Sequence, residues 1–304
     1  MHVLASRRFP GPAWEELGDV EYGTLPQERR EDIDALAVVG ETIDGSIADL
    51  LPNLRIVANY GVGYDGIDVE ALRARGIPVS NTPGVLDAAT ADLTLALILA
   101  VRRRVLEADR FVRSGEWASG WAGQYLLADD LEGATLGIVG LGRIGTAVAR
   151  RARGFGLGLL YTRRTRLPAA AERQLGVEYR RLDELLGESD IVTLHLPLTE
   201  ETRGLIGARQ LARLRDGASL VNTARGQIVD ERALVAELIA GRIRAGLDVF
   251  ADEPNVPEEL LALPNVVLTP HIGSATTPTR EAMTRVLVDN LLAAEAGRPL
   301  PDRL

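Results

Sequence analysis

Three charged side chains in the second half of the sequence each follow an apolar run, and their types suit acid–base chemistry. Arg225 lies in VNTARG, Glu253 in DVFADEP and His271 in LTPHIGSAT. An imidazole can exchange a proton near neutral pH, a neighbouring carboxylate stabilises its charged form, and an arginine can bind a carboxylate through charge-assisted hydrogen bonds. Each residue alone could be an ordinary loop charge. Their shared position after successive apolar runs favours one catalytic site instead.

A glycine-rich stretch, residues 134–161, indicates that a dinucleotide binds near these residues. The apolar run Leu136–Val139 leads directly into a G-x-G-x-x-G motif formed by Gly140, Gly142 and Gly145, and a helical pattern and a second apolar run follow. The motif alone is weak, but with a strand before it and a helix after it the pattern is typical of a dinucleotide-binding βαβ unit. We expect the first glycine to permit the tight turn, the second to admit a pyrophosphate and the third to let the helix pack closely.

A dinucleotide site beside an imidazole, a carboxylate and an arginine suits hydride transfer between a nicotinamide and a 2-oxo acid. A carbonyl that accepts hydride develops alkoxide character and needs a proton donor. The donor must come from the three histidines, His2, His195 and His271. The sequence has no lysine, which excludes Schiff-base chemistry and leaves arginine as the permanent cation for binding a carboxylate.

The elements that must position these residues alternate between strand-like and helical segments. We expect strands at 2–5, 36–40, 55–59, 77–80, 136–139, 157–161, 190–195, 218–223, 245–249 and 266–269, and helices at 45–51, 68–75, 208–214, 231–240 and 280–294. This alternation predicts an α/β protein with parallel sheets, in the form of two Rossmann-like or flavodoxin-like domains. The carboxyl ends of parallel strands meet at one edge of a sheet, so the three charged residues should converge there.

The order of these segments predicts that one domain is inserted into the other. A long helical pattern over residues 86–112 would connect them, and the last helix would return the chain to the first. We expect a substrate domain at 1–97 and 276–304 and a dinucleotide-binding domain at 98–275.

Composition excludes several classes of function. The chain has 304 residues, a formal net charge of −9 and no cysteine. The negative charge argues against nucleic acid as a partner, and the lack of cysteine removes disulfides and thiolate metal sites. No metal site is predicted. The sequence shows no apolar run long enough for a signal peptide or a membrane span, so we expect a cytoplasmic location with no membrane partner.

Six motifs carry a resemblance that extends over nearly the whole chain: VANYGVGYDGID, GLGRIG, HLPLTEETRGLI, VNTARGQIVD, AGLDVFADEP and VLTPHIGSAT. With these, the sequence resembles the D-isomer-specific 2-hydroxyacid dehydrogenases, and within them the glyoxylate and hydroxypyruvate reductases. The resemblance implies that Arg225 binds the substrate, that Glu253 is the carboxylate partner and that His271 is the acid–base group. It implies that His195 lies beside the nicotinamide and is not the acid.

The resemblance also implies the residues that bind the cofactor and the substrate. The substrate should contact Arg225, His271 and the loop of Val62 and Gly63, whose N–H groups could hold a small carboxylate. The expected cofactor contacts are Gly140, Leu141, Gly142, Arg143, Ile144, Gly145, Arg163, Arg164, Thr165, His195, Pro197, Thr223, Ala224, Arg225, Asp248, His271 and Gly273.

The residues after the second apolar run of the βαβ unit predict the choice of cofactor. An acidic side chain ends this strand in NAD-specific domains and binds the ribose hydroxyls. Here Thr162 stands at that place and Arg163-Arg164-Thr165 follow. Arginine side chains can bind a 2′-phosphate, so the pattern favours NADP over NAD. A solvated loop is the alternative explanation of these arginines.

Trp117 and Trp121 lie in an expected loop, where aromatic side chains either anchor an interface or pack locally, and we favour an oligomer interface. The resemblance implies a homodimer joined through the cofactor domains. In related reductases the tryptophan that Trp121 matches reaches a neighbouring subunit, but Ala122 and Gly123 replace a His-Pro pair there.

Two alternatives to the reduction of glyoxylate or hydroxypyruvate stay open. The same catalytic residues could act on a bulkier 2-oxo acid, because pocket size depends on loop positions that a sequence does not reveal. The chain could also be a nucleotide-sensing, corepressor-like binding protein, since relatives with this fold serve that role. Turnover of any 2-oxo acid would separate the two enzyme hypotheses from the third.

Overall fold

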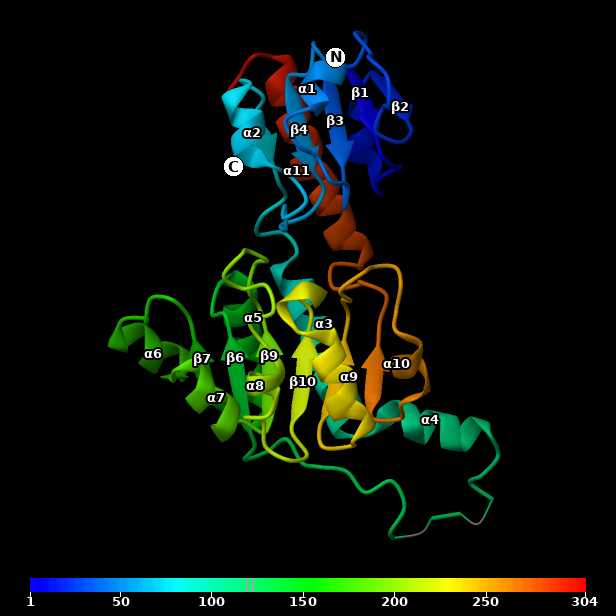
Figure 1. The fold of residues 1–304 in the computed structure, drawn as a ribbon, viewed down its shortest axis with the longest axis vertical. Helices are drawn as coiled ribbons and strands as arrows, with labels where there is room; N and C mark the ends of the chain where they lie inside the picture. Colours follow the sequence, from blue (N-terminus) through cyan, green and yellow to red (C-terminus); the bar gives the residue numbers. More distant parts are fainter. Residues whose placement is uncertain (119, 122) are drawn as a thin grey trace. The chain divides into compact units, whose positions relative to one another are not determined.

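A computed structural model describes residues 1–118, 120–121 and 123–304, so the position of Ala122 lies outside the described residues. The chain forms two units (Figure 1). The first consists of Met1–Leu86 and Ser274–Leu304, and the second of Asp87–Gly273. The second unit therefore interrupts the first in the sequence.

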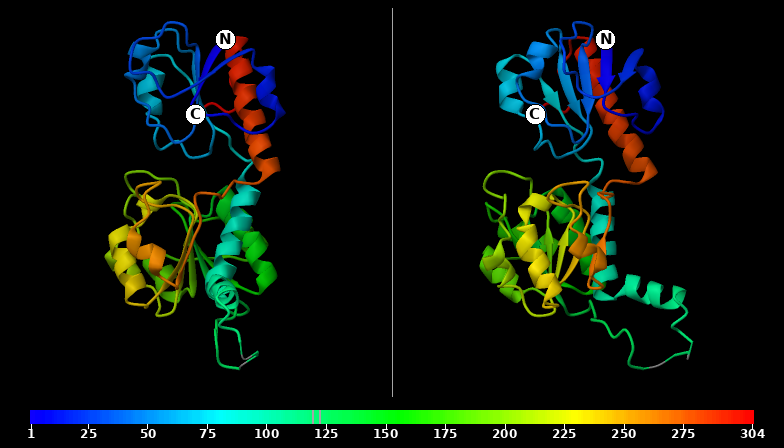
Figure 2. Two further views of the ribbon diagram at one scale, coloured as in Figure 1. Left: turned by 90° about the vertical axis from the view of Figure 1, so that its right-hand side faces the viewer. Right: turned by 45° about the vertical axis from the view of Figure 1, so that its right-hand side comes forward.

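The first unit is built on a five-stranded parallel sheet. Its strands, in spatial order, are β2 (Asp19–Tyr22), β1 (His2–Ala5), β3 (Ala35–Val38), β4 (Ile56–Asn59) and β5 (Val79–Ser80). This 2-1-3-4-5 order is flavodoxin-like. The helices α1 (Ile47–Leu50) and α2 (Val69–Ala74) cover one face, and α11 (Thr277–Glu295) covers the other together with η1 (Pro12–Glu16), as Figure 2 shows.

The second unit is built on a seven-stranded sheet that is also parallel. Its strands, in spatial order, are β12 (Val266–Leu268), β11 (Arg244–Leu247), β10 (Ser219–Asn222), β9 (Ile191–Leu194), β6 (Thr135–Val139), β7 (Gly158–Thr162) and β8 (Glu178–Tyr179). The chain order runs outward in both directions from the neighbours β6 and β9. This is the Rossmann arrangement, and ligands of such sheets bind where the order reverses.

Two layers of helices cover this second sheet. One layer has α3 (Asp87–Arg102), α5 (Arg143–Ala152) and α6 (Ala169–Leu175), and the other has α7 (Leu182–Glu188), α8 (Ala208–Leu211), α9 (Glu231–Ile239) and α10 (Glu258–Ala262). Buried apolar side chains fill the two cores between sheet and helices. The predicted α/β class with parallel sheets in two domains is confirmed.

The structure differs from the sequence prediction along the segment 86–112. Two helices replace the single predicted one: α3 ends at Arg102, and α4 (Val105–Arg113) begins after Arg104. The backbone of Arg104 is left-handed, with φ of 53°, and its side chain binds Glu107 and the carbonyl of Leu127. A residue with a left-handed backbone cannot continue an α-helix. The apolar spacing runs on through Arg104 and therefore gave no sign of the break.

The first division between the units also lies elsewhere than predicted. It falls at Leu86, before α3, and not at residue 97 within that helix. The reason is that Leu95, Leu97, Ile98 and Val101 all pack into the core of the second unit. The short edge strands β2 and β8 and the helices α6, α7 and α10 were not predicted, because their apolar patterns cover too few residues.

No helix in the described parts of the chain combines the length and apolarity that crossing a membrane requires.

Candidate active site

His271 and Glu253 form the centre of the candidate site. Nδ1 of His271 lies 2.7 Å from Oε2 of Glu253, and the other carboxylate oxygen accepts a 3.0 Å hydrogen bond from the Phe250 N–H. Burial acts to raise the pKa of Glu253, but the His271 ring, the Phe250 N–H and the charge of Arg225 outweigh it and lower that pKa below its ordinary value. The carboxylate therefore stays ionised and holds the ring through Nδ1, which leaves Nε2 as the atom for proton transfer.

A buried aspartate fixes the turn that carries His271. Asp248 is 1% exposed, and its Oδ1 accepts from the Thr269 hydroxyl at 2.6 Å and the Ile272 N–H at 2.8 Å. Its Oδ2 accepts from the Gly273 N–H at 2.8 Å. His271 itself has a left-handed backbone with φ of 53°, which is uncommon for a residue other than glycine. The aspartate thus stabilises a conformation that local preference alone would not select.

Arg225 follows β10 in a loop that a neighbouring asparagine organises. Asn222 is 1% exposed; its amide donates to the Arg225 carbonyl at 2.8 Å and its side-chain oxygen accepts from the Ala224 N–H at 3.0 Å. The next residue, Gly226, approaches the following loop so closely that an added Cβ would lie 2.0 Å from the Phe250 carbonyl carbon. This contact holds the Arg225 loop against the chain that leads to Glu253. The predicted catalytic residues thus occupy adjacent loops of one unit.

The glycine turn has the geometry that the sequence predicts. Gly140 has φ of +97°, and a Cβ on Gly145 would lie 2.2 Å from the Gly140 carbonyl oxygen, so the turn is tight and the helix is close. An added Cβ at Gly142 would meet no atom within 4 Å. That open backbone stands at the amino end of α5, where unpaired N–H groups and the helix dipole favour an anion. These residues fit the pyrophosphate of a dinucleotide.

The remaining predicted cofactor residues follow the carboxyl ends of neighbouring parallel strands. Leu141, Arg143 and Ile144 follow β6; Arg163, Arg164 and Thr165 follow β7; His195 and Pro197 follow β9; Thr223 and Ala224 follow β10; Gly273 follows β12. All belong to the second unit. A hydrogen bond to α3 fixes Thr223, because its hydroxyl lies 2.9 Å from the hydroxyl of Thr94 on that helix.

His195 has a different electrostatic environment from His271. Burial lowers the pKa of His195 to about 3, and its Nε2 lies 3.0 Å from the Thr193 hydroxyl. The ring is therefore neutral near pH 7 and has no proton to donate as an imidazolium.

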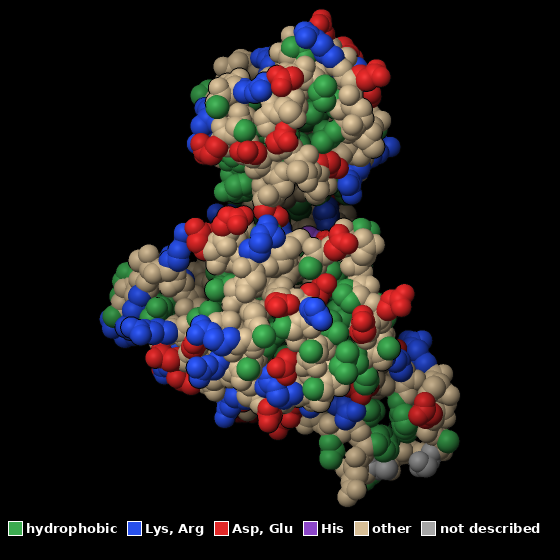
Figure 3. Space-filling model, in the orientation of Figure 1, with side chains coloured by type: hydrophobic (Ala, Val, Ile, Leu, Met, Phe, Trp, Pro, Cys, Tyr) green, Lys and Arg blue, Asp and Glu red, His purple; other side chains and the backbone are tan. Residues whose placement is uncertain are grey.

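The loop after β7 is shaped by a carboxylate that the sequence analysis did not single out. Glu172 on α6 is 8% exposed, and both of its oxygens bind Arg166, at 2.8 and 2.9 Å. It also accepts from the Tyr161 hydroxyl at 2.7 Å, and that hydroxyl accepts from the Leu167 N–H at 2.8 Å. Arg166 is thereby bound by Glu172, although its side chain is exposed. The side chains of Arg163, Arg164 and Thr165 are exposed as well, and Arg163 donates to the Leu141 carbonyl at 3.4 Å. Figure 3 shows basic side chains over this side of the unit.

Val62 and Gly63 lie in the first unit, in the loop after β4. Side-chain amides bind the carbonyls of this loop: Asn59 donates to Gly61 and Gly63, and Asn81 donates to Val62. Sequence reasoning missed both asparagines, as it missed Asn222. A buried asparagine next to a strand gives no signal in a single sequence, because its role depends on which carbonyls come within reach.

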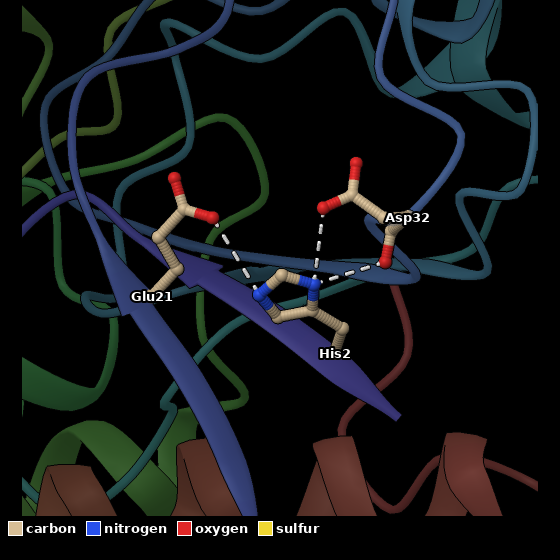
Figure 4. A group of neighbouring side chains, drawn as sticks. All are labelled: His2, Glu21 and Asp32. Atoms are coloured by element: carbon tan, nitrogen blue, oxygen red, sulfur yellow. Dashed lines mark hydrogen bonds and ion pairs between the residues drawn. The ribbon is translucent and has the colours of Figure 1, made fainter.

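One group of side chains in the described residues has ligand atoms close enough for a metal ion: His2, Glu21 and Asp32, drawn in Figure 4. The His2 nitrogens lie 3.6 Å from Glu21 Oε2 and 3.4 Å from Asp32 Oδ2. Those same two oxygens bind Arg30, at 2.7 and 2.6 Å. The guanidinium holds the pKa of Asp32 down, at about 2. The Arg30 guanidinium therefore already binds the two carboxylate oxygens that a metal ion would need as ligands.

Comparison with known proteins identifies the family. Residues 95–273 match the model of the D-isomer specific 2-hydroxyacid dehydrogenase NAD-binding domain. The chain is 49% identical to the glyoxylate reductase of Thermococcus kodakarensis over 98% of its length and 90% of that protein.

Solved structures give the same result over the whole length of the chain. A Thermus thermophilus protein is 46% identical, with a TM-score of 0.93 and full coverage of both chains. An NADPH-dependent glyoxylate/hydroxypyruvate reductase from Sinorhizobium meliloti, solved with NADP and malonate, is 37% identical, with a TM-score of 0.89 and coverage of 100% of this chain and 96% of that one. The chain belongs to the D-isomer-specific 2-hydroxyacid dehydrogenases and is an NAD(P)-dependent oxidoreductase of that family.

Proposed function

We propose that this enzyme reduces a small 2-oxo acid, glyoxylate or hydroxypyruvate, to the 2-hydroxy acid. The observation that carries the proposal is the hydrogen-bonded pair of His271 and Glu253, 2.7 Å apart, at the carboxyl edge of a Rossmann sheet. Relatives that are about half identical over nearly the whole chain are named glyoxylate reductases, which supports the same substrate class.

In this mechanism the residues of the site bind the substrate and move one proton. Arg225 binds the carboxylate of the 2-oxo acid and polarises its carbonyl, and the N–H groups of Val62 and Gly63 hold the same carboxylate. The reduced nicotinamide supplies the hydride when it is bound. His271 then gives the proton on Nε2 to the developing alkoxide, while Glu253 stabilises the imidazolium from the Nδ1 side. His195, neutral near pH 7, takes no part in this transfer.

The cofactor would be held along the carboxyl edge of the second sheet. The turn from Gly140 to Gly145 and the amino end of α5 would bind the pyrophosphate, and Thr223, Ala224, Asp248 and Gly273 would contact the nicotinamide half. We propose NADP as the preferred form. Arg163 and Arg164 are exposed after β7, and Glu172, the carboxylate nearest in the chain, already binds Arg166 and Tyr161 through both oxygens.

We also propose a homodimer. The segment of α4 and the following loop presents large apolar side chains to solvent, among them Val112, Trp117, Trp121 and Leu127, with exposed fractions of 54%, 50%, 86% and 66%. A monomer rarely exposes so many large apolar side chains on one segment.

The test is a substrate panel. Oxidation of NADPH and of NADH would be followed with glyoxylate, hydroxypyruvate, pyruvate and a branched 2-oxo acid. We expect the highest kcat/KM with one of the first two and NADPH. A preference for the branched acid would favour the bulkier-substrate alternative, and cofactor binding without any turnover would favour a binding protein.

A further inference from the structure

Three consecutive carbonyl groups in the loop after β4 accept hydrogen bonds from side-chain amides of the first unit. Nδ2 of Asn59 lies 3.1 Å from the Gly61 carbonyl oxygen and 2.9 Å from that of Gly63. Nδ2 of Asn81 lies 2.9 Å from the Val62 carbonyl oxygen. Each of these three peptide groups is thus held by a side-chain amide.

This arrangement determines the direction of the neighbouring N–H groups. The peptide bonds here are trans, and in a trans peptide the C=O and the next N–H point in opposite directions. With the carbonyls of residues 61, 62 and 63 turned toward the asparagines, the N–H groups of Val62, Gly63 and Tyr64 point away from them. In the described part of the chain these three N–H groups donate to no protein acceptor. Successive N–H groups that point the same way form a concave site for an anion.

The two asparagines are placed as permanent parts of the fold. Asn59 is the last residue of β4 and Asn81 follows the adjacent strand β5, and they are only 4% and 7% exposed. A second contact fixes the same loop, because the Thr82 N–H donates to the Gly61 carbonyl at 3.1 Å. Buried amides that donate in this way hold a backbone more rigidly than solvated groups do.

We propose that Asn59 and Asn81 are positioning residues that orient an anion-binding group of three N–H donors, and that Tyr64 supplies the third donor beside Val62 and Gly63. This inference rests on the proposed function insofar as the anion is the carboxylate of the 2-oxo acid. The asparagines act through the loop and do not touch the substrate. Their effect is therefore on substrate affinity and not on the binding of the dinucleotide.

The test replaces each asparagine in two ways. Asn59→Asp and Asn81→Asp keep the size of the side chain but replace a donor with a charged acceptor that repels the loop carbonyls. Asn59→Ala and Asn81→Ala remove the donor without adding charge. We expect KM for glyoxylate to rise roughly 10-fold or more in each variant. The reason is that the loop loses the hydrogen bond that orients its N–H groups toward the charged carboxylate. KM and Kd for NADPH should stay within about twofold of the wild-type values, since the pyrophosphate site is in the other unit.

Asn290→Ala is the matched control. Asn290 is also buried in the first unit and its amide binds the Val286 carbonyl and Asp302, but it has no contact with the loop. It should lower the melting temperature without changing KM for glyoxylate. If Asn59 and Asn81 variants changed only the melting temperature, or changed kcat with KM unaltered, the proposal would be overturned.

A binding experiment separates this inference from the proposed reaction. Oxalate, a small dicarboxylate, would be titrated calorimetrically into the wild-type enzyme saturated with NADPH and into the variants. Oxalate binding that is lost in Asn59→Asp supports the inference even if no 2-oxo acid is reduced. Equal binding to wild type and variants, or no binding to the wild type, contradicts it whatever the turnover.

Discussion

The left-handed backbone of His271 and the buried carboxylate of Asp248 make the proposed acid–base group a rigid part of its turn. The ring is oriented by Glu253 on one side and its main chain is held by the aspartate on the other. Rigid placement of a proton donor lowers the cost of reaching the reactive geometry.

Replacing His271 with alanine should lower kcat for 2-oxo acid reduction by roughly 10²- to 10⁴-fold, the range for loss of a general acid. His195→Ala should lower kcat far less, because burial keeps that imidazole neutral and it has no proton to give near pH 7. Steady-state kinetics with glyoxylate and saturating cofactor would measure both. A larger loss from His195→Ala would show that the acid has been assigned to the wrong histidine.

At the residue scale, the sequence points to the ionisable side chains of the candidate site more readily than to the neutral side chains that bind the surrounding backbone. Arg225, Glu253 and His271 could be proposed from the sequence because each follows an apolar run and because charged residues at strand ends are conspicuous. Asn59, Asn81 and Asn222 could not, since each is uncharged and nothing in the sequence sets it apart from the other asparagines. Their roles appear only when the fold brings backbone carbonyls and N–H groups within about 3 Å of the amide.

The link between β7 and α6 shows how one helix supports the loop proposed to bind the 2′-phosphate. Glu172 on α6 binds Arg166 and Tyr161, and Tyr161 in turn binds the Leu167 N–H, so both ends of the segment from Thr162 to Leu167 are tied. The Thr162 carbonyl also accepts from the Gly140 N–H at 3.0 Å. Arg163 and Arg164, between these two ties, have exposed side chains.

Alanine at both Arg163 and Arg164 should raise KM for NADPH about 10-fold or more and change KM for NADH little, because only NADPH carries the 2′-phosphate that the guanidinium groups would bind. The control variant Arg150→Ala/Arg173→Ala removes the same charge from exposed positions on α5 and α6. It should change neither KM appreciably. Equal effects of the first variant on the two cofactors would contradict the assignment of NADP.

Glu172→Gln should weaken the anchorage of this segment in a way that depends on pH. Arg166 and Tyr161 lower the pKa of Glu172 from 4.5 to about 2 in the folded state. A carboxylate whose pKa is lower in the folded than in the unfolded protein adds to the free energy of unfolding. For Glu172 this contribution is complete above pH 4.5, and it disappears as the pH falls toward 2. The difference in melting temperature between wild type and variant should therefore be largest near pH 6 and shrink below pH 4.5. A difference that is constant with pH would exclude an ionised Glu172 as its cause.

At the element scale, strands were easier to predict than helix limits. A buried parallel strand is a continuous apolar run, as in β9 and β10, and such runs stand out. The break between α3 and α4 could not be predicted, because the apolar spacing continues through it and the left-handed Arg104 depends on its contacts with Glu107 and with the Leu127 carbonyl. The two-residue strands β5 and β8 owe their existence to neighbours and not to their own sequence.

On the scale of the whole molecule, the exposed apolar segment after α3 is the reason for expecting a homodimer. Trp121 is 86% exposed, whereas the Trp117 indole N–H donates to the Tyr125 hydroxyl at 2.6 Å within the segment. The segment thus has some internal order and still presents an aromatic surface, which suits burial against a second copy of the chain.

Sedimentation velocity should give a dimer at micromolar concentration, and Trp121→Ser should shift it toward monomer, because a large exposed aromatic is a common anchor of an interface. Tyr22→Ser, at another exposed aromatic position in the first unit, serves as the control and should leave the dimer intact. A wild-type protein that sediments as a monomer at these concentrations would refute the proposed assembly.

The interruption of the first unit has a consequence for how the enzyme emerges from the ribosome. The sheet of that unit is synthesised before residue 87, but α11, whose Met283, Leu287 and Leu291 are fully buried in it, is synthesised after residue 273. The second unit is contiguous and can complete its own core in the interval, since domains fold as units during translation. For the time needed to translate that insertion, the nascent first sheet has one uncovered apolar face. A factor that shields such faces on nascent chains would therefore act on the opening residues of this protein, and its release would await the final helix.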